Sequence, residues 1–181
     1  MTLRRGFKTE ANAYSREMRL ELGLAAHSPL CQWQLAEHLG HTVLPMSSYI
    51  DLHSREVLHL SSNKGRKEFS AVTVNSEIGP IIIHNDRHDT KRQAANLAHE
   101  CAHGLLHHKP CALFDGTKRV YNAEMEEEAC WLGPALLISD EAALLIANRR
   151  YSLEQASDLY GASIEVIRFR LNVCGAARRA A

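Results

Sequence analysis

The chain has 181 residues, enough for one domain and a small appendage. Hydrophobic residues make up 45% of it, which permits a sizeable core, and the 23% of charged residues can cover that core. Twenty-one basic residues balance 21 acidic ones, and the formal net charge of +0 argues against a general polyanion-binding protein.

Nothing in the sequence indicates export or membrane insertion. The N-terminal segment has no apolar stretch of the kind found in signal peptides, and no run approaches the roughly 18 apolar residues of a membrane span. The five cysteines are odd in number and irregularly spaced, unlike a disulfide framework. We therefore expect a reduced, cytoplasmic protein.

Two helices are predicted at the start of the chain. Apolar residues recur at helical spacing from about Lys8 to Leu22, which predicts an amphipathic helix. A second, shorter helix over about 30–39 would stop at Gly40, a suitable residue to end a helix.

The pattern then changes to short β-branched runs separated by turn-rich segments. These runs predict strands within residues 41–48, 56–62, 69–75 and 80–85. The last run contains Ile81, Ile82 and Ile83 in succession, so we expect that strand to be covered on both faces.

Helical periodicity returns after residue 88. Asp89 or Thr90 can cap a helix that runs to about Leu106. After a loop, the remaining predicted helices are a long one over 123–138, a short one capped by Asp140, and two around a turn at 161–163.

The stretch NLAHECAHGLLHH, residues 96–108, contains the motif H-E-x-x-H. Histidines four residues apart share one helix face, so the imidazoles of His99 and His103 can reach one zinc ion. Glu100 lies about 100° further around the helix, where it can hold a water on the metal without being a ligand. It can accept the proton of that water and pass it to the leaving amine.

The motif alone is moderately specific, because a shuffled chain of this composition would contain it in roughly one case in twenty. Its context strengthens the interpretation: Ala98, Ala102 and Leu105 can pack behind the helix while both histidines face away. The alternative is a pair of surface histidines on a helix.

A zinc hydrolase also needs a third protein ligand and an open position for water. The acidic cluster Glu126–Glu128 follows about 20 residues later on a helix that can return antiparallel to the first. Glu126 lies near the buried face of that helix and Glu127 points further away, although a solvated acidic face is the usual role of such a cluster.

These segments resemble the ImmA/IrrE metallopeptidases, which are of the gluzincin type. The family pattern near the first helix is an Arg followed by A-H-E-x-x-H and a short apolar run, here Arg92 and AHECAHGLL. The family glutamate helix, E-x-x-A-(N or D)-x-F-A with an apolar end, corresponds to EEEACWLG and ALLIS. Similar segments extend the resemblance over about residues 6–176.

The resemblance implies an α+β, zincin-like fold in which a small twisted sheet packs on an active-site helix. It implies Zn²⁺ bound by His99, His103 and Glu126, with Glu100 as the catalytic residue. It also implies a protein substrate, commonly a helix-turn-helix repressor or antitoxin whose cleavage switches on stress-response, mobile-element or phage genes.

Cys130 departs from the family pattern. The family has Asn or Asp four residues after the glutamate ligand, where that residue supports a zinc-bound histidine. A thiol accepts hydrogen bonds weakly, so Glu127 or Glu128 could take this role instead. We expect Cys130 to share the face of Glu126.

Several other polar residues have more than one interpretation. His107 and His108 either end the helix, where they suit its dipole, or join Cys111 in a separate metal site. His84 and His88 are solvated loop residues or substrate contacts. Tyr121 or Arg119 could stabilise an oxyanion.

We divide the chain into a zinc metallopeptidase domain, residues 1–147, and a helical tail, residues 148–181. The tail resembles part of a helix-turn-helix and is expected to pack on the peptidase. Its C-terminal stretch, residues 160–179, has four arginines, Arg168, Arg170, Arg178 and Arg179, which are few for direct DNA binding. The predicted function is a zinc endopeptidase; the alternative is a non-hydrolytic zinc-binding regulatory or toxin-type protein that acts by partner binding.

Overall fold

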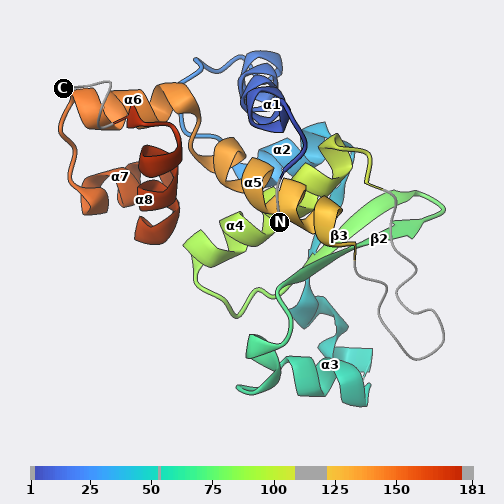
Figure 1. The fold of residues 1–181 in the computed structure, drawn as a ribbon. Helices are drawn as coiled ribbons and strands as arrows, with labels where there is room; N and C mark the ends of the chain where they lie inside the picture. The colour runs from blue at the N-terminus through green and yellow to red at the C-terminus, as the bar shows by residue number, and fades with distance from the viewer. Residues whose placement is uncertain (1–2, 53, 109–121, 177–181) are drawn as a thin grey trace.

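The computed structural model describes residues 3–52, 54–108 and 122–176. Within them, the elements in chain order are α1 (Phe7–Glu21), α2 (Gln32–His38), β1 (Thr42–Pro45), η1 (Met46–Leu52), α3 (Arg55–Leu60), η2 (Gly65–Lys67), β2 (Ala71–Ser76), β3 (Gly79–His84), α4 (Thr90–Leu105), α5 (Ala123–Leu137), α6 (Asp140–Asn148), α7 (Leu153–Tyr160) and α8 (Ile164–Val173). The predicted α+β class is confirmed: one small sheet accompanies many helices (Figure 1).

The three strands form one mixed sheet in the order β1-β3-β2. β1 runs parallel to β3, and β2 pairs with β3 in the antiparallel direction. Ile82 is fully buried in the central strand, whereas Ile81 and Ile83 on the other face are partly exposed. The expected cover on both faces is therefore only partial, and β2 keeps one edge unpaired within the described sheet.

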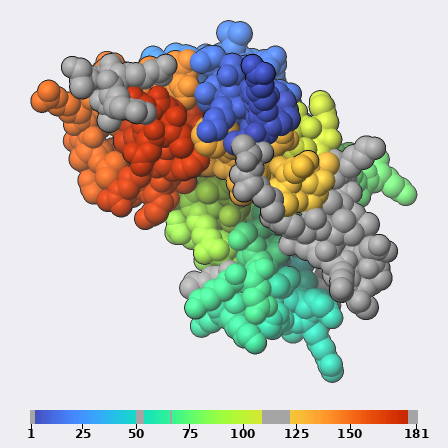
Figure 2. Space-filling view, viewed as in Figure 1, coloured from blue at the N-terminus to red at the C-terminus, as the bar shows by residue number. Residues whose placement is uncertain are grey.

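The strand predicted within residues 56–62 is wrong, because residues 56–60 belong to helix α3 and Ser61 caps its end. The Ser54 side chain caps this helix by accepting a hydrogen bond from the Val57 amide at 3.1 Å. Leu58 is 47% exposed, so the apolar residues that resemble a strand do not enter the core. Figures 1 and 2 place this segment at the opposite end of the molecule from α6, α7 and α8.

The predicted helix ends agree with the structure within one residue except at the start of α2, which begins at Gln32 and not at about residue 30, and at α6. Asp89 caps α4 by accepting from the Arg92 amide, and Gly40 has a positive φ of 75° just after α2. At α6 the cap is Ser139, which accepts from the Ala142 amide, and Asp140 is the first helical residue.

Helix α4 lies between two apolar clusters and contributes to both. Leu97 and Cys101 pack in the first cluster, with residues of α1, α2 and α5. Ala94 and Ala98 pack in the second, with residues of α5 to α8. The described part of the tail therefore shares a core with the helix that carries the H-E-x-x-H motif; the division at residue 147 stays a prediction.

Two buried arginines hold the C-terminal end of α5, and we call them the arginine anchor. Arg19 of α1 donates to the carbonyl oxygen of Leu136 at 2.9 Å, and Arg170 of α8 donates to that of Ile138 at 2.8 Å. Both side chains are fully buried. They satisfy carbonyl groups that the end of a helix leaves unpaired, and their charge suits the negative end of its dipole.

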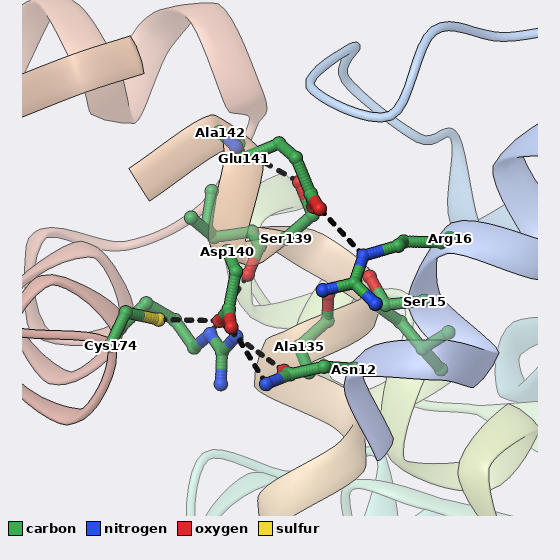
Figure 3. Close-up of polar contacts among 12 residues, drawn as sticks. Asn12, Ser15, Arg16, Ala135, Ser139, Asp140, Glu141, Ala142 and Cys174 are labelled. Atoms are coloured by element: carbon green, nitrogen blue, oxygen red, sulfur yellow. Dashed lines mark hydrogen bonds and ion pairs between the residues drawn. The ribbon is translucent and has the colours of Figure 1, made fainter. Parts of the chain in front are cut away.

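Asp140 pairs with the Arg170 side chain at 2.8 Å and links three elements. Figure 3 shows it between Asn12 of α1, which donates to it at 2.7 Å, and Cys174 at the end of α8. These contacts join the tail to the N-terminal helix through the start of α6.

Taken singly, no helix in the described ranges is long and apolar enough to cross a membrane. Helices α5 and α6, which meet at 49°, pass the test of length and composition only as a pair. Many of their apolar residues are packed in the two clusters, including Ala129, Leu132, Leu136 and Ile146.

Candidate metal centre

Helices α4 and α5 bring His99, His103 and Glu126 together. The two histidines lie one turn apart on α4, and their Nε2 atoms are 3.1 Å apart. Glu126 lies in the first turn of α5, where Asn122 caps the helix by accepting from the Glu124 and Met125 amides. Its carboxylate oxygens are 3.3 Å from His99 Nε2 and 3.7 Å from His103 Nε2.

This triangle has the size of a tetrahedral metal site. Nitrogen and oxygen ligands about 2.0–2.2 Å from a zinc ion at tetrahedral angles are about 3.3 Å from one another. The two histidine nitrogens are 3.1 Å apart, and they lie 3.3 and 3.7 Å from different oxygens of the Glu126 carboxylate. With one ligand atom taken from each residue, the three atoms lie within 4.8 Å of one another, close enough to hold one metal ion. All three side chains are partly exposed, so the site is open on one side for a further ligand.

Gly133 allows α5 to approach α4 at this point. A Cβ atom on Gly133 would lie 3.3 Å from the backbone N and Cα atoms of His99 and 3.4 Å from the carbonyl carbon of Ala98. Contacts this short are rare for real side chains, so a side chain here would require the helices to shift by a few tenths of an ångström. Glycine at this position therefore favours the close approach of α5, which carries Glu126, to the helix of the two histidines.

Glu100 lies next to the triangle but does not belong to it. Its Oε2 atom accepts a 2.5 Å hydrogen bond from the Thr73 hydroxyl on β2. Thr73 faces α4 because it is paired with Ile82, and directly paired residues of antiparallel strands share a face. Burial raises the pKa of Glu100 above its usual range, and the hydrogen bond from Thr73 opposes that shift.

The triangle and Glu100 open into a pocket of about 1220 Å³. One wall is β2, from Ala71 to Asn75, whose outer edge pairs with no other described strand. Other parts of the lining come from α1, from His41 before β1 and from the N-terminal end of α5. The pocket is large enough for several residues of an extended peptide.

Cys130 is not where the sequence predicts it. It is solvent-exposed and lines a separate small hollow with Leu3, Glu127, Trp131 and Phe169. The expectation that it shares the metal-facing side of Glu126 is therefore wrong. Cys130 lies with Glu127 and Trp131 at this hollow and does not line the pocket of the histidines.

Other predicted site residues have different positions from those expected. His84 and His88 are buried, and neither lines the pocket, so they are not solvated loop residues. Arg119, Tyr121 and Cys111, which were considered for an oxyanion donor and a second metal site, lie outside the described residues.

In the described part of the tail, residues 148–176, Arg149 and Arg150 are exposed next to α6. Arg170 is fully buried and is engaged by Ile138, Asn12 and Asp140. Arg178 and Arg179 lie outside the described residues, and Arg168 is exposed.

The sequence did not predict that Thr73, His41 and His108 contact the site. Thr73 acts across the sheet, and the His41 ring lies against Gly104, where a Cβ atom would come within 2.9 Å of it. His108 contacts His103 from beyond the end of α4. None of these contacts follows helical or strand periodicity, so no sequence pattern marks them.

The fold and the site together are those of the zincin-like class of α+β proteins. One helix carries the two histidines, a second helix carries the carboxylate, and the small sheet carries Thr73, which binds Glu100. Residues 36–172 match the model of the Peptidase M78 family, described as the IrrE N-terminal-like domain, and the chain belongs to this family of metallopeptidases. The resemblance to ImmA/IrrE metallopeptidases is thereby confirmed. No curated protein and no solved structure matched the chain.

Proposed function

We propose that this protein is a zinc-dependent endopeptidase that cleaves a regulatory protein, of the helix-turn-helix repressor or antitoxin type that the family resemblance implies. The observation that carries the proposal is the triangle of His99, His103 and Glu126, whose ligand atoms lie within 4.8 Å of one another, beside a partly buried Glu100. The coarser activity, a metallopeptidase, follows from the family.

The proposed roles follow from the positions of the side chains. The imidazoles of His99 and His103 and the Glu126 carboxylate hold the metal. A zinc ion bound there supplies Lewis acidity, polarising the substrate carbonyl and lowering the pKa of a bound water to about 7. Glu100 accepts a proton from the attacking water and donates it to the leaving amine.

The unpaired edge of β2 favours the proposal that the substrate is a peptide. An extended chain can add to such an edge through main-chain hydrogen bonds. These bonds form with peptides of many sequences, so specificity comes from the pockets that receive the side chains. Because Thr73 of the same strand holds Glu100, a peptide on this edge would lie close to the base. The size of the pocket, about 1220 Å³, is consistent with such a ligand.

The test compares the wild-type protein with Glu100→Gln and His103→Ala. We expect about one zinc per wild-type chain, the same zinc content in Glu100→Gln, and much less in His103→Ala. New protein N-termini are then identified by mass spectrometry in cells that carry the wild-type or the Glu100→Gln protein. Specific cleavage should occur only with the wild type.

Each outcome distinguishes between the proposed roles of the site residues and an alternative. Loss of zinc from Glu100→Gln would make Glu100 a ligand, and full zinc in His103→Ala would exclude the assigned triangle. Zinc binding by the wild type without any cleavage would favour the alternative, a regulatory protein that acts by partner binding.

A further inference from the structure

The two ring nitrogens of His103 face different neighbours. Its Nε2 atom points into the triangle, 3.1 Å from His99 Nε2 and 3.7 Å from Glu126. Its Nδ1 atom lies 2.9 Å from the Nδ1 atom of His108. The nitrogen that does not face the metal position therefore has a defined partner within the protein.

The end of α4 brings His108 into this position. His107 has a positive φ of 50°, the amide of His107 donates to the Gly104 carbonyl, and the amide of His108 donates to the His103 carbonyl. This pair of bonds is the Schellman motif, in which the second residue beyond the cap lies over the third-last residue of the helix. Those two residues here are His108 and His103.

A metal bound to His103 would determine which ring nitrogens of His103 and His108 carry a proton. A metal bound at Nε2 leaves the proton of the neutral ring on Nδ1, so His103 donates to His108. His108 must then accept at Nδ1 and carry its own proton on Nε2. That Nε2 atom lies 3.1 Å from a Glu128 oxygen, which accepts the bond.

Glu128 is itself held on its other side. Its second oxygen accepts a 2.6 Å hydrogen bond from Arg4 Nε, and Arg4 also pairs with Glu10 of α1. The side chains of His108 and Glu128 are only 7% and 16% exposed, in contrast to Arg4 at 50%. Water therefore competes little with the bond between His108 and Glu128.

We propose that His108 and Glu128 are positioning residues of the metal centre: His108 fixes the ring orientation and tautomer of His103, and Glu128 fixes His108. A zinc-bound histidine commonly donates its other N–H to a carboxylate, and here an imidazole stands between the two. This inference rests on the proposed zinc site. It assigns to His108 and Glu128 the function that residue 130 has in the family pattern; the sequence offered Glu127 or Glu128 as substitutes, and Glu128 is the one that contacts His108.

The experiment measures zinc affinity of the full-length protein by chelator competition. His108→Ala should weaken zinc binding about tenfold, the lower end of the range for groups that support metal ligands. His108→Asn should restore most of this loss, because the amide oxygen can accept the bond from His103. Glu128→Ala should show a smaller loss, since His108 keeps its bond to His103.

The matched control is His59→Asn. His59 and Glu68 form another histidine–glutamate pair, 2.9 Å apart and exposed. Glu68 lines the pocket, but His59 does not. This variant should leave zinc affinity unchanged. The absorption spectrum of the cobalt-substituted protein gives a second readout, and it should change with His108→Ala but not with His59→Asn.

A purely structural role of His108 would give different results. The melting temperature of the metal-free protein would fall in His108→Ala while the zinc affinity stayed the same, and this outcome overturns the inference. Equal loss of affinity in His108→Ala and His108→Asn also overturns it. A wild-type protein that binds no zinc refutes the proposed function together with this inference, so the two failures are distinguishable.

Discussion

At the scale of single residues, the Thr73 hydroxyl has the clearest energetic role. It donates to Glu100, a carboxylate whose burial disfavours the charged form. A hydrogen bond to a charged group contributes about 1.5–3 kcal/mol. Thr73 therefore stabilises and orients the group that we assign as the base.

We expect Thr73→Val to lower kcat/KM about tenfold, the equivalent of roughly 1.4 kcal/mol, with no change in zinc content. The substitution removes the hydroxyl but keeps the β-branched shape. The measurement uses a peptide that spans a bond cut by the wild type. Thr73→Ser keeps the hydroxyl and should retain most of the activity; if it is as slow as Thr73→Val, the loss has another cause.

The sequence predicts the metal-binding and catalytic residues of the candidate site better than the residues that hold them in position. His99, Glu100 and His103 are close in the chain and follow helical geometry, so their relation needs no tertiary information. Glu126 required the family resemblance to separate it from its neighbours. Thr73 reaches Glu100 through strand pairing, and His108 reaches His103 through a helix-ending turn, so neither contact has a periodic signal.

At the scale of elements, the packing of α5 on α4 controls the metal triangle. We expect Gly133→Ala to lower the free energy of unfolding by about 1–3 kcal/mol, because the added methyl group meets the backbone of His99. It should also weaken zinc binding, since the helix that carries Glu126 must move outward. Chemical denaturation of the metal-free protein and chelator competition measure the two effects.

Cys130→Ala is the control on the same helix. Its side chain is exposed, so both the stability and the zinc affinity should stay close to those of the wild type. A Gly133→Ala protein with unchanged zinc affinity would show that the distance between the helices is not set at this position.

The elements themselves were predictable where local signals agreed. Helix α4 has both a periodic apolar face and an Asp89 cap, and its bounds match the prediction within one residue. Residues 55–60 have β-branched and apolar residues but also the Ser54 cap, and the cap prevailed because no neighbouring strand pairs with this segment among the described residues. A short apolar run alone does not distinguish a strand from a helix.

At the scale of the whole molecule, Asp140 holds the tail against the N-terminal helix. We expect Asp140→Ala to lower the free energy of unfolding by about 3 kcal/mol, because it leaves the fully buried Arg170 without its charged partner. Denaturant unfolding of the metal-free protein measures the loss.

Glu141→Ala provides the comparison at the next position. Glu141 pairs with Arg16 at 2.6 Å, but the Arg16 side chain is 50% exposed and that of Glu141 is 32% exposed, so its removal should cost about 1 kcal/mol or less. Equal effects of the two substitutions would mean that the burial of Arg170 is not what makes Asp140 important.

The arginine anchor holds α5 at the end that lies far from the metal triangle. Eleven residues separate Glu126 from Leu137, which corresponds to a length of about 16 Å. A tilt of about 4° at the anchored end would displace Glu126 by about 1 Å, several times the tolerance of about 0.2 Å on a metal–ligand distance. Neither Arg19 nor Arg170 lines the pocket, yet we expect the position of Glu126 to depend on how rigidly they hold the remote end of this helix.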